Sequence, residues 1–190
     1  MDQKRVTAFH TLSWSIYDSW SELLAGTRFL LDILENDSCD EIAKRNLLRL
    51  VVVSSSQMAE VMLFTQLEKI VNSHPDSVKR LFDYELRKRI SFSEARTKWP
   101  EILTGRTFNF GCEPMQSMEL LYKCRNDAIH HTAKCPSENI GESAFYTAIE
   151  SSKCIYNHFN PDNWNDCEYR TFVDNNLPKT KSLLKQVLGG

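Results

Sequence analysis

The stretch PMQSMELLYKCRNDAIHHTA, from Pro114 to Ala133, sets the expected architecture because it reads as one amphipathic helix. Its apolar residues recur at helical spacing; they are Met118, Leu121, Tyr122, Ala128 and Ile129. With about 100° of rotation per residue, Arg125 falls in the middle of this apolar face. A guanidinium keeps its proton, so a buried one needs paired partners. We therefore expect Arg125 either to be bonded inside a helical bundle or to line a cleft or an interface.

Other parts of the chain predict further helices. Apolar residues keep helical steps from Thr7 to Leu34 and from Ser137 to Phe159. The same period runs from Ser38 to Asn72, where Ser38 matches a capping box with Glu41. A charged helix is predicted from Asp76 to Ile90, directly after a proline, which suits a helix start. The sequence thus predicts an all-α fold, an up-and-down helical bundle of four to five main helices with short accessory helices.

A chain of 190 residues suits a single domain, and its least regular part is expected as a loop-rich insertion near residues 91–113. There the Ser91 and Glu94 pair matches a capping box and predicts a short helix, Ser91–Lys98. Trp99-Pro100 and the residues from Gly105 to Gly111 are interpreted as loop. Three residues of this loop favour a brief strand: Thr107, Phe108 and Phe110.

The last part of the chain, residues 160–190, is expected to form a loop and a short C-terminal helix. The stretch from Asp162 to Asn176 is rich in Asn and Asp, which is typical of surface loops. Three aromatic residues are expected to hold this loop against the bundle: Trp164, Tyr169 and Phe172. The residues from Lys179 to Leu188 keep a short apolar stripe and predict the last helix.

The composition is that of an ordinary globular protein, with 42% hydrophobic and 25% charged residues. A net charge of −2 and a pI near 6.2 argue against a protein that coats nucleic acid by bulk charge. No signal-peptide core and no membrane span are recognised, and six cysteines without a C-x-x-C motif fit reduced thiols, so we expect a cytoplasmic protein. His131, Cys135 and Cys124 share one side of a helix, but this spacing is weak evidence, so no metal and no cofactor are predicted.

The pattern Arg125-Asn126-x-x-x-His130 resembles the R-N-x-x-x-H signature of the HEPN superfamily, whose broader form is Arg, four to six residues, His. Many members are metal-independent endoribonucleases, including toxins, anti-phage effectors and CRISPR-associated nucleases. The resemblance implies a helical protein that binds RNA and works as a homodimer with one composite active site. It covers one helix at the level of the motif.

Cleaving RNA without a metal needs a proton acceptor for the 2′-hydroxyl, a group that stabilises charge on the phosphorane and a proton for the leaving oxygen. By the resemblance, His130 is the acid/base, Arg125 stabilises the phosphate and Asn126 orients either group. His131 also fits the broader motif and remains an alternative acid/base. In an ideal helix Arg125 and His130 lie about 140° apart, which a dimer relieves because each arginine can approach the partner's histidine.

Basic residues of the charged helix are candidates for holding RNA phosphates, although a solvated charged face is the usual explanation for such a run. They are Lys79, Arg80, Arg87, Lys88 and Arg89.

The main alternative to a ribonuclease is a non-catalytic HEPN-like module for helical dimerisation, interaction or nucleotide sensing. In that case Arg125 would form a structural ion pair with Asp127 or with Glu60, and Glu60 itself could instead be solvated. An antitoxin or another regulatory protein is a further expected partner.

Overall fold

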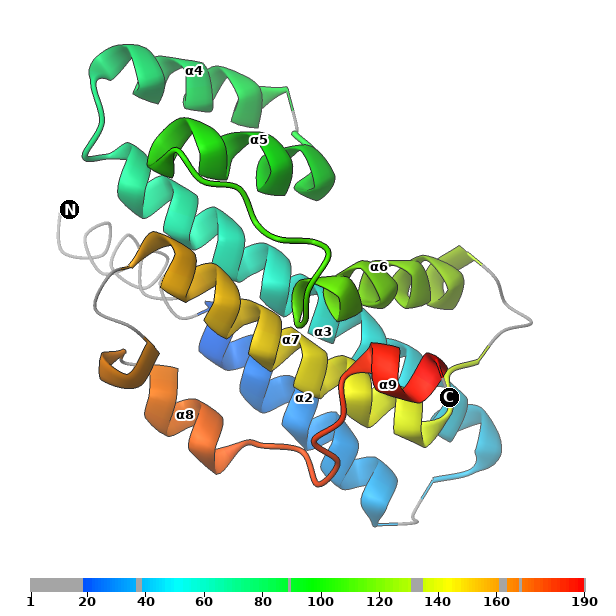
Figure 1. Cartoon of the computed structure of the whole chain (residues 1–190). Helices are drawn as coiled ribbons and strands as arrows, with labels where there is room; N and C mark the ends of the chain where they lie inside the picture. The colour runs from blue at the N-terminus through cyan, green and yellow to red at the C-terminus, as the bar shows by residue number, and fades with distance from the viewer. Residues whose placement is uncertain are drawn as a thin grey trace, which may run out of the picture.

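A computed structural model describes residues 19–36, 39–88, 90–130, 135–160, 164–167 and 169–189, and this part of the chain contains helices and no strand (Figure 1). The predicted all-α class is therefore confirmed. The helices in chain order are α2 (Ser19–Glu35), α3 (Glu41–Val71), α4 (Asp76–Arg87), α5 (Phe92–Thr104), α6 (Met115–His130), α7 (Glu138–Phe159), a 3-10 turn (Trp164–Asp166), α8 (Tyr169–Asn175) and α9 (Leu184–Leu188).

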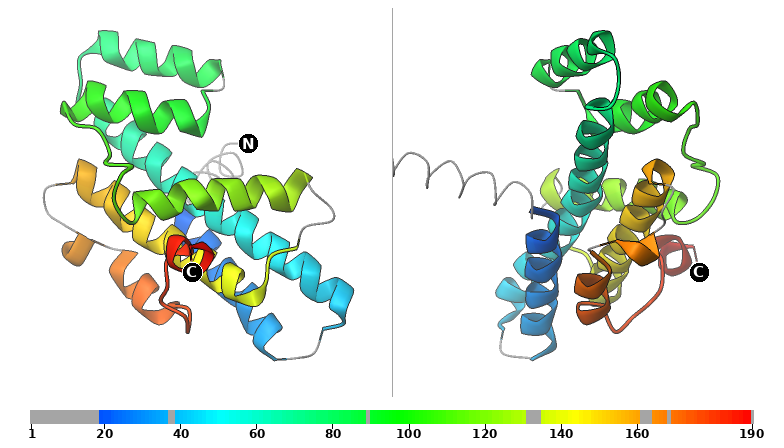
Figure 2. Two further views of the ribbon diagram at one scale, coloured as in Figure 1. Left: turned by 45° about the vertical axis from the view of Figure 1, so that its right-hand side comes forward. Right: turned by 90° about the vertical axis from the view of Figure 1, so that its left-hand side faces the viewer.

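Helix α3 is the centre of the fold, and α2 and α7 pack against different sides of it (Figure 2). Its N-cap is Asp40, whose side chain accepts a hydrogen bond from the amide of Ala43 at 2.8 Å. The predicted cap, Ser38, lies outside the described residues and two positions before the observed N-cap. The Asp40 carboxylate accepts a hydrogen bond from a free amide at the helix start, and its negative charge also matches the positive end of the helix dipole. Asp40 therefore caps the helix better than a serine hydroxyl would.

The N-terminal helix is only partly described. The predicted helix from Thr7 to Leu34 corresponds to α2 from Ser19 onward, and residues 1–18 lie outside the described part. Helix α2 returns antiparallel to α3, with the Thr27 hydroxyl bonded to Ser54 at 2.8 Å.

Helices α3 and α7 run parallel, which differs from the predicted up-and-down order. Near their N-terminal ends a Cβ placed on Gly141 would lie 3.1 Å from Leu48, and near their C-terminal ends Asn160 donates to Gln66 at 2.8 Å. The parallel direction is possible because α4, α5 and α6 fill the connection between the two helices. Any larger residue at position 141 would have to displace the Leu48 side chain by a few tenths of an ångström, so glycine suits this close approach.

The segment predicted as a loop-rich insertion holds a longer helix than expected. Ser91 and Glu94 form the predicted capping box, but α5 continues past Lys98 and through Pro100 to Thr104. Trp99 and Pro100 are buried, so packing against the rest of the fold outweighs the cost of a proline inside a helix. The helix ends at Gly105, whose φ of 68° is a left-handed conformation that glycine adopts without strain. The predicted strand at 107–110 does not form; these residues are irregular.

The C-terminal region also differs from the predicted loop. A 3-10 turn and α8 occupy most of the stretch from Asp162 to Asn176, and α9 is shorter than predicted. Two of the expected anchors are correct: Trp164 and Tyr169 are buried against Trp20, with ring centroids 6.0 and 5.1 Å from it. Phe172 is wrong as an anchor, because it is 49% exposed.

One helix, α3, is long and apolar enough to cross a membrane by length and composition, although no membrane span was expected from the sequence. Half of the stretch that meets this test is buried inside the fold. It makes contacts with α2, α5, α6 and α7. The composition of α3 is therefore explained by its central place in the bundle.

Candidate functional site

Arg125 lies on α6, at the edge of a groove and outside the sealed core. Its side chain is half-buried, and Nη1 donates a hydrogen bond to Oδ1 of Asn126 at 3.1 Å. Among the described residues, no carboxylate oxygen lies within 4.0 Å of its guanidinium. Of the two placements that the sequence allowed, the cleft is therefore the one observed, and the internal ion pairs with Glu60 or Asp127 do not form.

The groove beside Arg125 has a volume of about 1030 Å³ and is formed mainly by two helices. Its lining residues belong to α2 and α3, together with Arg125 of α6. Apolar residues from both helices alternate with three glutamates: Leu23, Leu30, Val61 and Phe64 with Glu22, Glu60 and Glu68. No residue of α7 lines it. The groove thus combines an apolar lining with an excess of negative charge.

Glu60 is the glutamate that interacts most clearly with Arg125. Burial raises the pKa of its half-buried carboxyl, and the positive charge of Arg125 opposes this rise without cancelling it. Partial desolvation also raises the pKa of Glu68, for which no cation is a cause of the shift. The predicted alternative of a fully solvated Glu60 is therefore not what the structure shows, and neither is a closed ion pair.

His130 is the last residue of α6 and is exposed to solvent. It does not line the groove that Arg125 borders. Five residues along a helix separate the two side chains by about 7.5 Å of axial rise as well as by direction. One chain therefore does not bring the guanidinium and the imidazole of His130 to one atom. Asn126 is exposed beside Arg125, and His131 lies outside the described residues.

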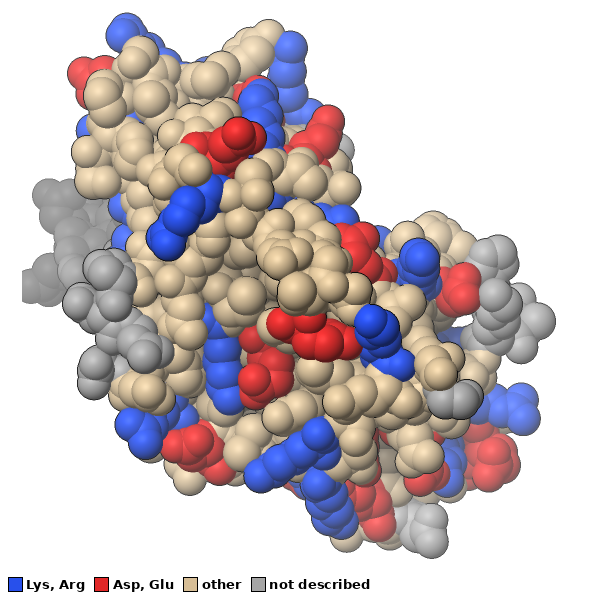
Figure 3. Space-filling view, viewed as in Figure 1, with Lys and Arg blue, Asp and Glu red and all other residues tan. Residues whose placement is uncertain are grey.

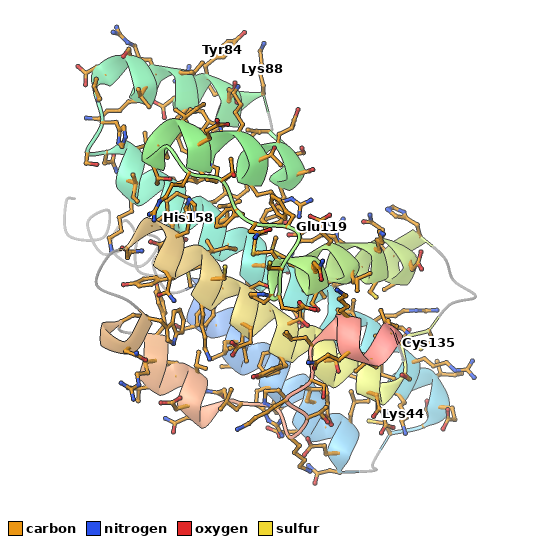
Figure 4. The ribbon with its side chains drawn as sticks, in the orientation of Figure 1. Lys44, Tyr84, Lys88, Glu119, Cys135 and His158 are labelled. Atoms are coloured by element: carbon orange, nitrogen blue, oxygen red, sulfur yellow. The ribbon has the colours of Figure 1, made fainter. Side chains whose placement is uncertain are left out.

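The basic residues of α4 lie away from Arg125. Helix α4 packs on α5 and the C-terminal end of α3, whereas the C-terminal half of α6 extends away from α4 near the middle of the bundle (Figures 1 and 2). Lys79 pairs with Asp76 at 3.7 Å, and the Lys88 ammonium lies 4.3 Å from the centre of the Tyr84 ring (Figure 4). Arg80 and Arg87 are exposed, and Arg89 lies outside the described residues.

A second arginine, Arg96 on α5, is buried and paired inside the fold, which is the environment that the sequence allowed for Arg125. Its guanidinium forms an ion pair with Glu119, which lies where α5 meets α6 (Figure 4). The guanidinium carbon lies 4.9, 5.5 and 5.9 Å from the ring centres of three aromatic residues: Phe110, Phe92 and Tyr122. We refer to these three rings with Glu119 as the Arg96 cage. The sequence signal for it was weak, because its aromatic members are far apart along the chain.

Metal binding has no support in the described part of the chain, where no group of three His, Cys, Asp or Glu side chains could hold an ion. Cys124 is half-buried, and burial raises the pKa of its thiol. Cys135 is exposed and donates to the carbonyl of Arg45 at 3.7 Å. Cys124 and Cys135 therefore belong to no metal-binding group among the described residues. A metal site that includes His131 is considered from the sequence only, because His131 lies outside the described residues.

The charge is mixed on the face of the molecule that carries α7 and α9. Figure 3 shows the side of the molecule that carries α7 and α9, where basic and acidic side chains are interspersed and no large patch of one sign stands out. A protein surface that binds an extended phosphate backbone needs a row of basic side chains, and this face shows no such row.

Comparison of the chain with family models, with curated proteins and with solved structures finds no match in any of the three. No relative therefore indicates the chemistry of the site, which has to follow from its own residues. Arg125 and Asn126 together can hold an anionic oxygen at the edge of the groove, and His130 can exchange a proton with a molecule outside the chain.

Proposed function

We propose that the protein is a metal-independent endoribonuclease that works as a homodimer with a composite active site. The observation that carries this proposal is the state of Arg125, a half-buried guanidinium with an amide partner and with no ion pair among the described residues. A partly exposed guanidinium without a carboxylate at contact distance keeps donor groups that an anionic ligand can occupy. The R-N-x-x-x-H resemblance supports an RNA phosphate as that anion.

In the proposed reaction His130 removes the proton from the RNA 2′-hydroxyl. The 2′-oxygen then attacks the neighbouring phosphorus, and the bond from phosphorus to the 5′-oxygen breaks. Arg125 stabilises the extra negative charge on the phosphorane, because its planar fork matches two phosphate oxygens. Asn126 holds the guanidinium in position. The leaving 5′-oxygen takes a proton from an imidazole, and the products are a 2′,3′-cyclic phosphate and a 5′-hydroxyl.

The proposed seam of the dimer is the exposed edge of α6. Ile129 lies one helical turn beyond Arg125 and is 44% exposed, which leaves an apolar side chain beside the cation. A two-fold contact along this edge would cover Ile129 and bring Arg125 of one protomer toward His130 of its partner. Each chain would then supply only half of the site, which explains why Arg125 and His130 are apart within one chain.

The direct test is RNA cleavage by the purified protein in excess EDTA. We expect cleavage that leaves 2′,3′-cyclic phosphate or phosphate ends, and we expect His130→Ala to abolish it while the far-UV circular dichroism stays unchanged. His74→Ala is a matched control, because this histidine is bonded to the carbonyl of Ile70 at the end of α3. A requirement for Mg²⁺ or products with 3′-hydroxyl ends would remove the mechanism.

The same catalytic groups predict toxicity in a host cell. Expression of the protein should slow growth, and His130→Ala should relieve the effect, as for a toxin or an anti-phage effector. The control is His74→Ala at equal expression, which should remain toxic. Equal growth with the unaltered protein and with His130→Ala would count against a ribonuclease.

A second candidate function is a non-catalytic module that dimerises or binds a regulatory protein through the same helices. It is favoured by the three glutamates of the groove, which face one arginine and would repel a polyanion. This alternative predicts that Arg125→Ala alters association and that no RNA is cut at any pH. Light scattering of both proteins, together with the EDTA cleavage assay, separates the two functions.

A further inference from the structure

We propose that the groove between α2 and α3 is the docking site of a basic amphipathic helix from a partner protein. This inference goes beyond the proposed function and does not depend on RNA cleavage. It rests on the apolar lining of the groove, on the position of its glutamates and on its length.

The apolar lining is open to an incoming helix. Leu23 and Leu30 on α2 and Val61 and Phe64 on α3 are each only partly buried, although they contact the hydrophobic core. Phe29 stands at the rim with 63% of its surface exposed. Five apolar side chains along one concave strip are what a helix buries when it lays its apolar face into a groove.

The glutamates determine the charge of the occupant. Glu60 and Glu68 are eight residues apart on α3, which places them about 12 Å apart along the axis. Neither makes an ion pair with a described residue, and the surrounding protein raises the pKa of both carboxyls. Lysines or arginines seven or eight residues apart on a helix have the matching spacing, with apolar residues between them that would contact Phe64.

The length of the groove fits a helix of moderate size. The lining residues on α3 extend from Ser54 to Glu68, which corresponds to about 21 Å of helix axis. A docked helix of about 14 residues would cover this distance. A groove of about 1030 Å³ is also larger than most single small molecules need, which favours a peptide segment.

Charge also argues against the other occupants. A second copy docked groove to groove by a two-fold axis would bring the same glutamates against each other, and Arg125 is the one cation among the described residues of the lining. The N-terminal residues of the chain carry their basic pair at Lys4 and Arg5, which are adjacent in sequence and so do not match a spacing of two helical turns.

The test uses the full-length protein and a labelled 14-residue probe peptide with two lysines seven residues apart and three leucines between them. A control peptide has the same composition with the lysines adjacent. Fluorescence polarisation should show binding of the probe that is at least about tenfold tighter than binding of the control and that weakens with added salt. Equal binding of the two peptides, or no binding of the probe, would overturn the proposal.

Protein variants locate the contact. The double variant Glu60→Gln with Glu68→Gln should weaken probe binding about tenfold, which corresponds to about 1.4 kcal/mol. The matched control is Glu41→Gln with Glu101→Gln, two exposed glutamates that do not line this groove. Unchanged affinity in the groove variant, or an equal loss in the control, would contradict docking at this site.

Two further outcomes would identify another occupant and so overturn the proposal. If Lys4→Glu with Arg5→Glu strengthened probe binding, the N-terminal segment of the chain would be the natural occupant. If the Glu60→Gln and Glu68→Gln variant formed more dimer by light scattering, a second copy would compete for the groove. We expect neither change.

Discussion

Arg96 on α5 and Arg125 on α6 both act on one residue, Tyr122: burial raises the pKa of its hydroxyl, and the charges of the two arginines oppose this rise without cancelling it. Their surroundings differ sharply. Arg96 is buried under three aromatic rings and paired with Glu119. Arg125 stands half-buried at the edge of an acidic groove, and its one hydrogen-bond partner among the described residues is the side chain of Asn126. The fold therefore holds one guanidinium by an ion pair and aromatic rings, although its buried Nε has no hydrogen-bond partner among the described residues, and leaves the other partly exposed at the groove.

The difference shows how a structural arginine can be distinguished from a functional one. Each contact of Arg96 is made within the chain, so its role ends with the stability of the α5–α6 junction. The charge of Arg125 is balanced only partly by Glu60, which does not reach contact distance. Burial alone would have selected Arg96 as the functional residue, whereas the lack of an ion pair with a described residue and the position at the groove select Arg125.

The largest expected effect separates the two arginines by activity. If Arg125 stabilises the phosphorane, Arg125→Ala should slow RNA cleavage by about 10²- to 10³-fold, because a donor aimed at developing charge contributes that much. The free energy of unfolding should change by less than about 0.5 kcal/mol. Arg170→Ala, at an exposed arginine of α8, is the matched control and should cleave normally.

Stability should separate them in the opposite direction. Arg96→Ala removes the cation from between the rings of the Arg96 cage and takes the partner from the partly exposed Glu119, so unfolding should become easier by about 1 to 2 kcal/mol. Urea denaturation followed by circular dichroism measures this loss. Arg96→Lys should lose less, because it keeps the charge but not the flat stacking surface. A loss below about 0.5 kcal/mol would show that the Arg96 cage is not structural.

Double-mutant cycles sharpen the contrast further. The coupling between Arg96 and Glu119, measured with alanine at each position, should reach about 1 to 2 kcal/mol because they are in contact. The coupling between Arg125 and Glu60 should stay below about 0.5 kcal/mol, because they interact only through space. Equal coupling in the two pairs would place Arg125 in a structural ion pair after all.

The smallest expected effect concerns Glu60. Its pKa is raised in the folded protein, so the folded state binds a proton more readily than the unfolded chain does, and stability falls as pH rises from about 4.5 through the folded pKa. Glu60→Gln removes this decline. The variant should equal the unaltered protein near pH 4 and exceed it at pH 7 by well under about 1 kcal/mol, since solvent screens the site.

Thermal unfolding at both pH values measures this difference, with Glu101→Gln as the control at an exposed glutamate. A destabilising effect of Glu60→Gln at pH 7 would mean that the attraction to Arg125 outweighs desolvation.

Local signals were the part of the fold that could be predicted from sequence. The Ser91 and Glu94 capping box and the helix start at Ser137 are found as predicted, because each depends on residues within one turn. The extension of α5 through Pro100 could not be predicted, since it depends on burial of Trp99 against Phe82 from another helix.

The same limit applies to the candidate site. The sequence placed Arg125 in an apolar stripe, which is right for Leu121 and Ala128 but not for Ile129. A helical period gives the direction of each side chain, but it does not say where the neighbouring helix ends. The groove arises from the spacing of α2 and α3, and the Arg96 cage arises from residues of α5, α6 and the loop between them. Neither leaves a pattern within a single helix.

The most direct test of the account is complementation between two inactive variants. Arg125→Ala and His130→Ala proteins, each inactive alone, are mixed in equal amounts, allowed to exchange subunits and assayed for RNA cleavage in EDTA. If the guanidinium of one protomer works with the imidazole of its partner, half of the dimers contain one intact pair, and about a quarter of the unaltered activity should return. A mixture that stays as inactive as either variant alone would contradict a site shared between two copies.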